Sequence, residues 1–119
     1  MSNPISLQKG IEMTTLYRNE QENILAEEFR GKNILARSET FDRTSVEELL
    51  AKTGCEKMRI YYGMDSELKV HAILVAVNDK NEDILPTAVN ENVRDDAYYL
   101  WEDAKRCPPE CPPDSPLNP

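Results

Sequence analysis

The most constraining feature of this sequence is the segment from Leu68 to Val77, which ends in an unbroken apolar run. Its first half alternates between apolar and polar residues, whereas every residue from Ala72 to Val77 is apolar. Successive side chains of a strand point to opposite faces, so such a run is buried only where both faces are covered. The sequence therefore predicts a central strand with other elements packed over it.

The preceding segment predicts a neighbouring strand. In Lys57 to Tyr62, the residues Met58, Ile60 and Tyr62 alternate with more polar positions, which is typical of a half-buried strand. Gly63 to Glu67 predicts the turn that joins the two strands. We expect a hairpin with the Met58 side facing the core.

A third strand is expected at Ala97 to Trp101, where aromatic residues are dense. The same stretch also fits one face of a helix, so the alternative stays open. We favour the strand because a hairpin alone is only marginally stable and this sheet needs a third member.

Helices are expected before the hairpin. Residues 6–30 carry apolar residues at helical spacing, and a polar run at 19–23 is the expected point for a break into two shorter helices. A second helix follows, which Thr44 or Ser45 can cap, and the glutamate three residues on from each completes the capping-box arrangement. Gly54 fits the left-handed position that closes it.

These elements predict an α+β fold: an antiparallel sheet of about three strands, with the N-terminal helices packed on one face. We expect one domain over residues 1–106. Residues 107–119 form a tail that holds six of the chain's eight prolines. Proline fixes the backbone and removes a donor, so the tail is expected to be extended.

The composition limits the partners. Fourteen Lys and Arg against 22 Asp and Glu give the 119-residue chain a formal charge of −8, which disfavours nucleic acid and anionic membranes. No apolar run approaches the ~20 residues of a membrane span. Residues 1–10 lack the pattern of a secretory signal. We expect a soluble, acidic, cytoplasmic protein.

The three cysteines leave several interpretations open. Cys107 and Cys111 form a Cys-x₃-Cys pair that, with Cys55 and His71, has the donors of a Cys₃His zinc site. Alternatively the pair forms a disulfide, or all three thiols are free. Cys55 and His71 also have the residue types of a nucleophile pair, but no orienting group is evident, so we assign no catalytic residue.

Aromatic side chains gather in the predicted sheet. Those that face outward would form a protein-binding surface, because Tyr and Trp are enriched at interface hot spots. The alternative is that a helix covers them. The candidate interface residues are Tyr61, Tyr62, Tyr98, Tyr99 and Trp101.

Three motifs occur together here: Ile60-Tyr61-Tyr62-Gly63, His71-Ala72-Ile73-Leu74-Val75, and the tail run Arg106-Cys107-Pro108-Pro109-Glu110-Cys111-Pro112. With them the chain resembles a group of small uncharacterised proteins from Bacteroidetes. The resemblance covers most of the chain and the tail is its most distinctive part. It implies a bacterial source and carries no activity, substrate or site residue.

The sequence favours a non-catalytic protein-interaction or assembly module, acting on a protein partner or by self-association. It contains no glycine-rich phosphate loop, zinc-protease helix motif or nucleophile elbow. The alternative function is that of a small metal- or thiol-dependent protein that uses the three cysteines and His71.

Overall fold

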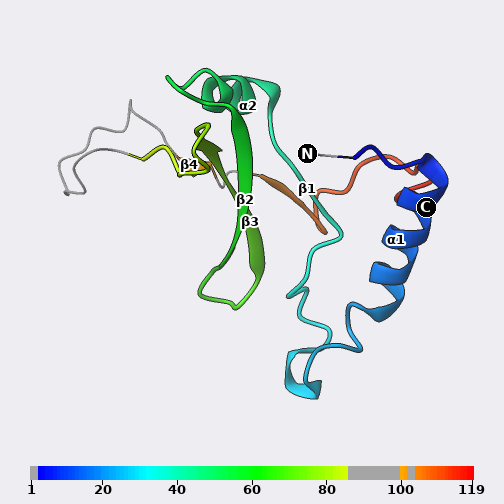
Figure 1. Ribbon diagram of the computed structural model, residues 1–119. Coiled ribbons are helices and arrows are strands. Elements are labelled where there is room, and N and C mark those ends of the chain that lie inside the picture. Colours follow the sequence, from blue (N-terminus) through cyan, green and yellow to red (C-terminus); the bar gives the residue numbers. More distant parts are fainter. Residues whose placement is uncertain (1–2, 86–99, 102–103) are drawn as a thin grey trace. The chain divides into compact units, whose positions relative to one another are not determined.

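The computed structural model describes residues 3–85, 100–101 and 104–119 (Figure 1). The chain divides into two compact units. One comprises Met1–Ser38 together with Arg106–Pro119, and the other comprises Glu39–Lys105. The predicted division into a domain over 1–106 and a tail from residue 107 stays a prediction. Within the described residues, no helix is long and apolar enough to cross a membrane.

The unit Glu39–Lys105 contains a three-stranded antiparallel sheet. Its strands are β2 (Lys57–Met64), β3 (Val70–Val77) and β4 (Leu100–Trp101), in the order β2-β3-β4. The predicted α+β class, the hairpin and the central strand are thus confirmed. Leu74, Val75, Ala76 and Val77 are all buried, as an apolar run in a central strand requires. The strand interpretation also holds for Leu100 and Trp101; residues 97–99 lie outside the described ranges.

The core of this unit lies between β3 and α2 (Arg43–Leu50). Leu49 is fully buried and clusters with Leu74 and Ala76 of β3. The partly buried residues around this cluster are Phe41, Val46, Cys55 and Ile84. Gly54 has a φ of +84°, so the predicted left-handed position after the helix is confirmed.

The predicted capping residue of α2 is wrong by two to three positions. The helix begins at Arg43 after the N-cap residue Asp42, which makes no side-chain capping bond. Glu47 instead pairs with Arg43 one turn earlier, at 2.5 Å. An i,i+4 ion pair on the helix surface therefore takes the glutamate that the capping box required.

The other unit begins with α1 (Leu7–Glu20), which Ser6 caps by accepting a hydrogen bond from the Lys9 amide at 3.0 Å. The helix ends at Glu20, inside the polar run where a break was expected, and a short 3₁₀ helix, η1 (Glu27–Phe29), follows. The predicted apolar stripe is not buried. Met13, Leu16 and Ile24 are more than half exposed.

Two short strands form a second sheet that the sequence analysis missed. They are β1 (Ser38–Thr40) and β5 (Lys105–Cys107), which pair with each other. No strand was predicted at either position. A strand of three polar residues has no apolar alternation, so nothing in its local sequence distinguishes it from a loop.

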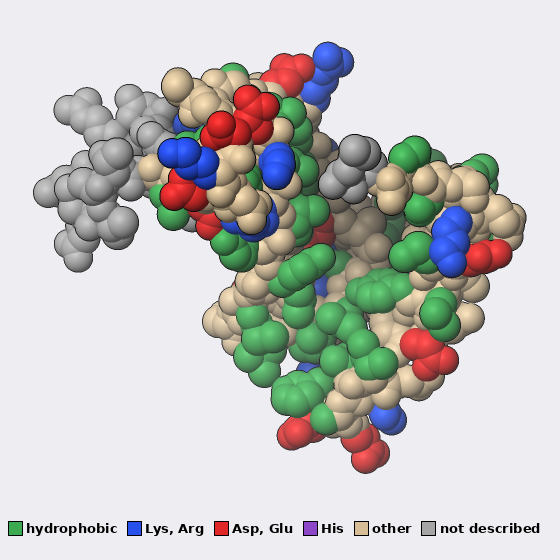
Figure 2. Space-filling view, viewed as in Figure 1, with side chains coloured by type: hydrophobic (Ala, Val, Ile, Leu, Met, Phe, Trp, Pro, Cys, Tyr) green, Lys and Arg blue, Asp and Glu red, His purple; other side chains and the backbone are tan. Residues whose placement is uncertain are grey.

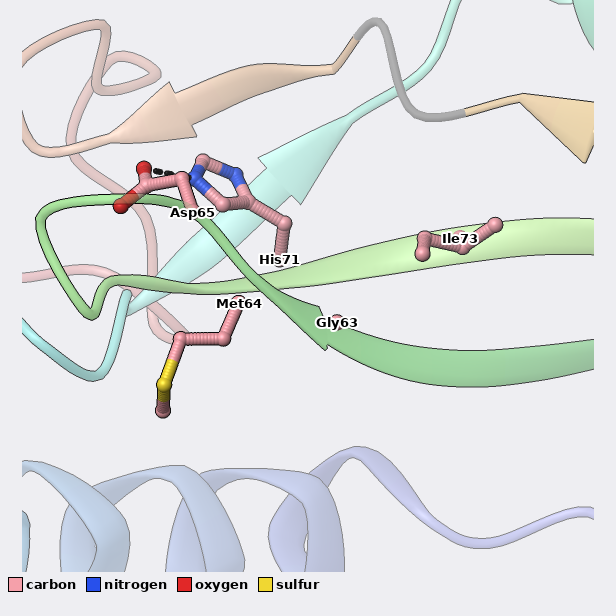
Figure 3. A pocket seen from close by; sticks show the side chains of 5 residues that line it. All are labelled: Gly63, Met64, Asp65, His71 and Ile73. Atoms are coloured by element: carbon pink, nitrogen blue, oxygen red, sulfur yellow. Dashed lines mark hydrogen bonds and ion pairs between the residues drawn. The ribbon is translucent and has the colours of Figure 1, made fainter.

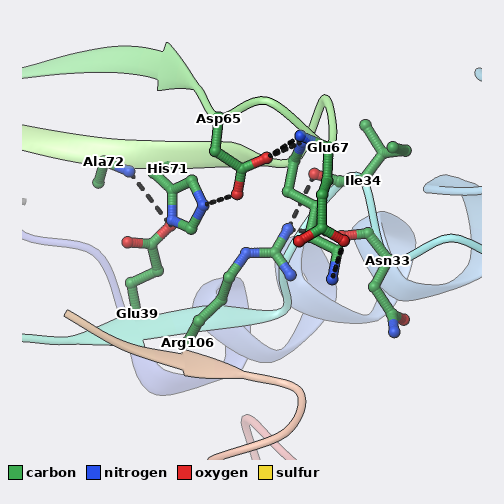
Figure 4. A network of polar contacts seen from close by, with 9 residues as sticks. Asn33, Ile34, Glu39, Asp65, Glu67, His71, Ala72 and Arg106 are labelled. Atoms are coloured by element: carbon green, nitrogen blue, oxygen red, sulfur yellow. Dashed lines mark hydrogen bonds and ion pairs between the residues drawn. The ribbon is translucent and has the colours of Figure 1, made fainter.

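The tail is ordered against its own unit. Cys107 and Cys111 are joined by a disulfide, and the Arg18 guanidinium of α1 donates to the Leu117 carbonyl at 2.8 Å. Just before the tail, the buried Arg106 donates to the carbonyls of Asn33 and Ile34 at 2.6 and 2.9 Å (Figure 4). Charged hydrogen bonds thus fix the chain where the tail begins.

Candidate functional site

The hydrogen-bonding pattern of the hairpin determines which way β2 turns its backbone groups. The Asp65 amide donates to the Lys69 carbonyl at 3.0 Å, and the register continues through Gly63 opposite His71 and Tyr61 opposite Ile73. In an antiparallel ladder, bonded and non-bonded pairs alternate. The odd-numbered residues of β2 therefore bond to β3, and the even-numbered residues direct their N–H and C=O groups to the opposite side.

That opposite side is the outer edge of β2. The strand order places β2 at one end of its sheet, and no strand in the described part of the chain pairs with this edge. The same four even-numbered residues carry apolar side chains that share one face. We call them the apolar row: Met58, Ile60, Tyr62 and Met64.

The apolar row is exposed, contrary to the expectation that this side of β2 faces the core. Met58 and Ile60 are 42% and 46% exposed, and Tyr62 and Met64, closer to the turn, are 78% and 59% exposed. Figure 2 shows hydrophobic side chains at the surface in the region of the hairpin.

The short length of α2 explains this exposure. The helix spans about 12 Å, whereas β2 spans about 26 Å. Leu49 packs on Leu74 and Ala76, near the end of β3 that lies away from the turn (Figure 1). The helix therefore protects one end of the hairpin face, and the row becomes more exposed towards the other.

The opposite face of β2 carries polar side chains that are hydrogen-bonded. The Arg59 guanidinium donates to Asp83 and, at 2.7 Å, to the Asn81 side chain, and the Tyr61 hydroxyl also donates to Asp83. Tyr61 and Tyr62, both predicted interface residues, thus lie on different faces. Tyr61 belongs to this polar network and Tyr62 to the apolar row.

A second cluster lies at the hairpin turn. Nε2 of His71 is 2.7 Å from Oδ2 of Asp65, and its Nδ1 is 3.9 Å from Oε1 of Glu39 (Figure 4). The same Glu39 oxygen accepts from the Ala72 amide at 3.1 Å. The hydrogen bond from His71 lowers the pKa of Asp65, and the turn amides of Lys69 and Glu67 lower it further.

This cluster borders a pocket of about 80 Å³ lined by Gly63, Met64, Asp65, His71 and Ile73. Figure 3 shows Met64 on the other side of the strand from Asp65 and His71. A His–Asp pair can hold and pass a proton. However, the described lining contains no serine, threonine or cysteine that it would activate, and small-molecule pockets usually enclose about 300–1,000 Å³.

The structure does not bring Cys55 and His71 together. Cys55 precedes the end of β2 that pairs with Val77, whereas His71 lies near the turn, about 20 Å along the strand. The Cys55 thiol donates to the Lys57 carbonyl at 3.4 Å. In the described residues, no group of three or more His, Cys, Asp or Glu is arranged to hold a metal. The zinc site stays a prediction.

The remaining predicted interface residues are placed only in part. Trp101 pairs with Leu74 through its backbone in β4, and Tyr98 and Tyr99 lie outside the described residues. Sequence reasoning missed the cluster of His71 with Asp65 and Glu39. The usable signal was Asp65 at the start of a turn, six residues before a histidine on the returning strand; Glu39 offered none.

Comparison of the chain with protein-family models, with curated proteins and with solved structures gives no match.

Proposed function

We propose that this chain is a non-catalytic protein-interaction module, and that its binding surface is the outer edge of β2. One observation carries the proposal. The four residues that direct backbone donors and acceptors to the outer edge are the same four that expose the apolar row. Hydrogen-bonding capacity and apolar surface therefore coincide over the whole strand.

This combination suits the addition of an extended strand to a sheet. In that mode, backbone hydrogen bonds provide affinity and alternate side chains provide specificity. An incoming strand would place every second side chain against the apolar row. Met58 and Met64 at its two ends are flexible and polarisable, so they can adapt to different side chains.

Two further observations support binding over catalysis. The acid–base cluster of His71, Asp65 and Glu39 borders a pocket that is small. An unpaired strand edge with exposed apolar residues is also a liability for aggregation, which proteins normally protect against. Its presence here favours a partner that covers it.

The test replaces a backbone donor on the outer edge. Ile60→Pro removes an N–H that points away from β3, and proline is tolerated where the N–H of an edge strand faces outward. Tyr61→Pro, the matched control, removes an N–H that bonds to β3 and should unfold the hairpin. Tyr62→Ser removes apolar surface while keeping every backbone group.

The binding assay uses extended peptides selected from a random library against the wild-type chain. We expect their binding to shift the amide NMR signals of Met58, Ile60, Tyr62 and Met64. Ile60→Pro should abolish binding while its melting temperature stays near that of the wild type, and Tyr62→Ser should weaken binding. Peptides that bind Ile60→Pro as well as the wild type would contradict the proposal.

A further inference from the structure

β2 carries opposite charges at its two ends. Lys57 is its first residue and is exposed, whereas Asp65 directly follows its last residue, Met64. The Asp65 side chain is 37% exposed although it accepts hydrogen bonds from the turn and from His71. A strand with this polarity is complementary to a second copy of itself that runs in the opposite direction.

The geometry of such pairing is tightly limited. Residues directly opposite each other in an antiparallel pair point their side chains to the same face. A twofold axis perpendicular to the sheet must therefore pass midway between the two copies of one residue of β2, which then lie directly opposite each other. Self-pairing of this kind is isologous, as in most homodimers.

We propose that the partner of the outer edge is a second copy of this chain, paired antiparallel with the twofold axis at Tyr61. This inference rests on the proposed function and specifies its partner. Within the apolar row, Met58 then lies opposite Met64 of the second copy, and Ile60 lies opposite Tyr62. Lys57 lies opposite Asp65 of the second copy, twice in the dimer.

The neighbouring registers match less well. An axis at Ile60 places Lys57 opposite Gly63 and Glu56 opposite Met64. Each charged residue then lies opposite an uncharged one. An axis at Tyr62 places Arg59 opposite Asp65 of the second copy, but Arg59 already bonds to Asp83. It also places Lys57 opposite Glu67, but Glu67 lies in the turn beyond the end of β2. Charge complementarity therefore favours the axis at Tyr61.

Engineered cysteines test the register. In a Cys55→Ser background, which removes the free thiol, Tyr61→Cys places two cysteines on the axis with Cα atoms about 4.5 Å apart, within disulfide range. Two Ile60→Cys chains would have their engineered cysteines about 8 Å apart, and so would two Tyr62→Cys chains. A mixture of these two variants, however, brings the engineered cysteine of one chain directly opposite that of the other.

We expect mild oxidation to give a cross-linked dimer with Tyr61→Cys and with the mixture of Ile60→Cys and Tyr62→Cys, but not with either of the latter alone. Preferential cross-linking of Ile60→Cys alone or Tyr62→Cys alone would overturn the proposed register. Tyr61→Cys chains that stay monomeric would overturn the pairing itself.

Sedimentation equilibrium tests the charges. Lys57→Glu places like charges opposite each other and should weaken dimerisation by about tenfold, whereas Lys32→Glu, an equal charge change on the other unit, should leave it unchanged. Asp65→Asn keeps the side-chain oxygen that accepts from the turn amides and should weaken dimerisation less. Equal effects of Lys57→Glu and Lys32→Glu would contradict the proposal.

The two proposals can fail separately. If the wild type stays monomeric up to about 1 mM, where only about −4 kcal/mol is needed for half association, self-pairing is wrong. Peptide binding that Ile60→Pro abolishes would then still support the outer edge as a binding surface. If Ile60→Pro affects neither peptide binding nor dimerisation, both proposals are wrong.

Discussion

The two units of this chain bury different kinds of side chain. Among the described residues of Glu39–Lys105, the buried ones are aliphatic: Leu49 of α2 and the Leu74–Val77 run of β3. In the unit of Met1–Ser38 and Arg106–Pro119, the buried residues among those described are Ile34, Cys107 and the charged Arg106. The first unit relies on hydrophobic burial, whereas the second relies on polar bonds and a cross-link.

The polar bonds of the second unit hold its chain segments at several points. The Gln21 side chain donates to the Leu35 carbonyl at 3.1 Å, and the Tyr17 hydroxyl donates to the Ala36 carbonyl at 2.5 Å. Burial raises the pKa of Tyr17. Small units that lack a large core commonly depend on such supplements, disulfides above all. The two units should therefore respond to different perturbations.

The largest expected effect is on the aliphatic core. Leu49→Ala should lower the free energy of unfolding of Glu39–Lys105 by about 3 kcal/mol, because it leaves a cavity against Leu74 and Ala76. Chemical denaturation measures the loss. Leu50→Ala, the neighbouring residue on the same helix with 48% exposure, is the control and should cost less than about 1 kcal/mol.

The next largest effect is on Arg106. Arg106→Met keeps the apolar volume but leaves the carbonyls of Asn33 and Ile34 without their charged donor, which should cost about 2–3 kcal/mol. Amide exchange should rise in residues 7–38 and stay unchanged in β3. The exposed neighbour Lys105 provides the control variant, Lys105→Ala. Equal destabilisation of β3 would contradict the view that separate interactions stabilise the two units.

Removal of the disulfide should have the third largest effect on stability. Cys111→Ser removes the cross-link at its exposed end, and the chain-entropy model assigns about 2 kcal/mol to a loop this short. We expect faster amide exchange around Arg37, whose amide donates to the Cys107 carbonyl. Cys55→Ser, which alters a thiol in the other unit, should leave that exchange rate unchanged.

The smallest effect concerns the turn of the hairpin. The pKa of Asp65 is lower in the folded chain than in the unfolded one, so its contribution to stability is present above about pH 4 and is lost as the pH falls through the folded pKa. The amide NMR signals of Glu67 and Lys69 should report this titration. Asp65→Asn should abolish the pH dependence, and a turn that titrates in the same way without Asp65 would refute this assignment.

Much of the secondary structure followed from the sequence, because local patterns determine it. The apolar run Ala72–Val77 required a central strand, and the polar residues at 19–23 predicted the end of α1. The candidate site was predicted less well. Tyr62 was named as an interface residue, but its face was assigned to the core and the histidine cluster was missed.

The sequence by itself determined where the hairpin strands β2 and β3 lie and which residues of β2 share a face, since the two-residue period of a strand fixes both. Only the tertiary structure decided which face is covered, because that depends on where α2 ends along the hairpin. It also decided that Glu39 meets His71, since β1 has no local signal and is defined by its pairing with β5. Local periodicity determines which residues share a face of a strand, but long-range packing determines what that face contacts.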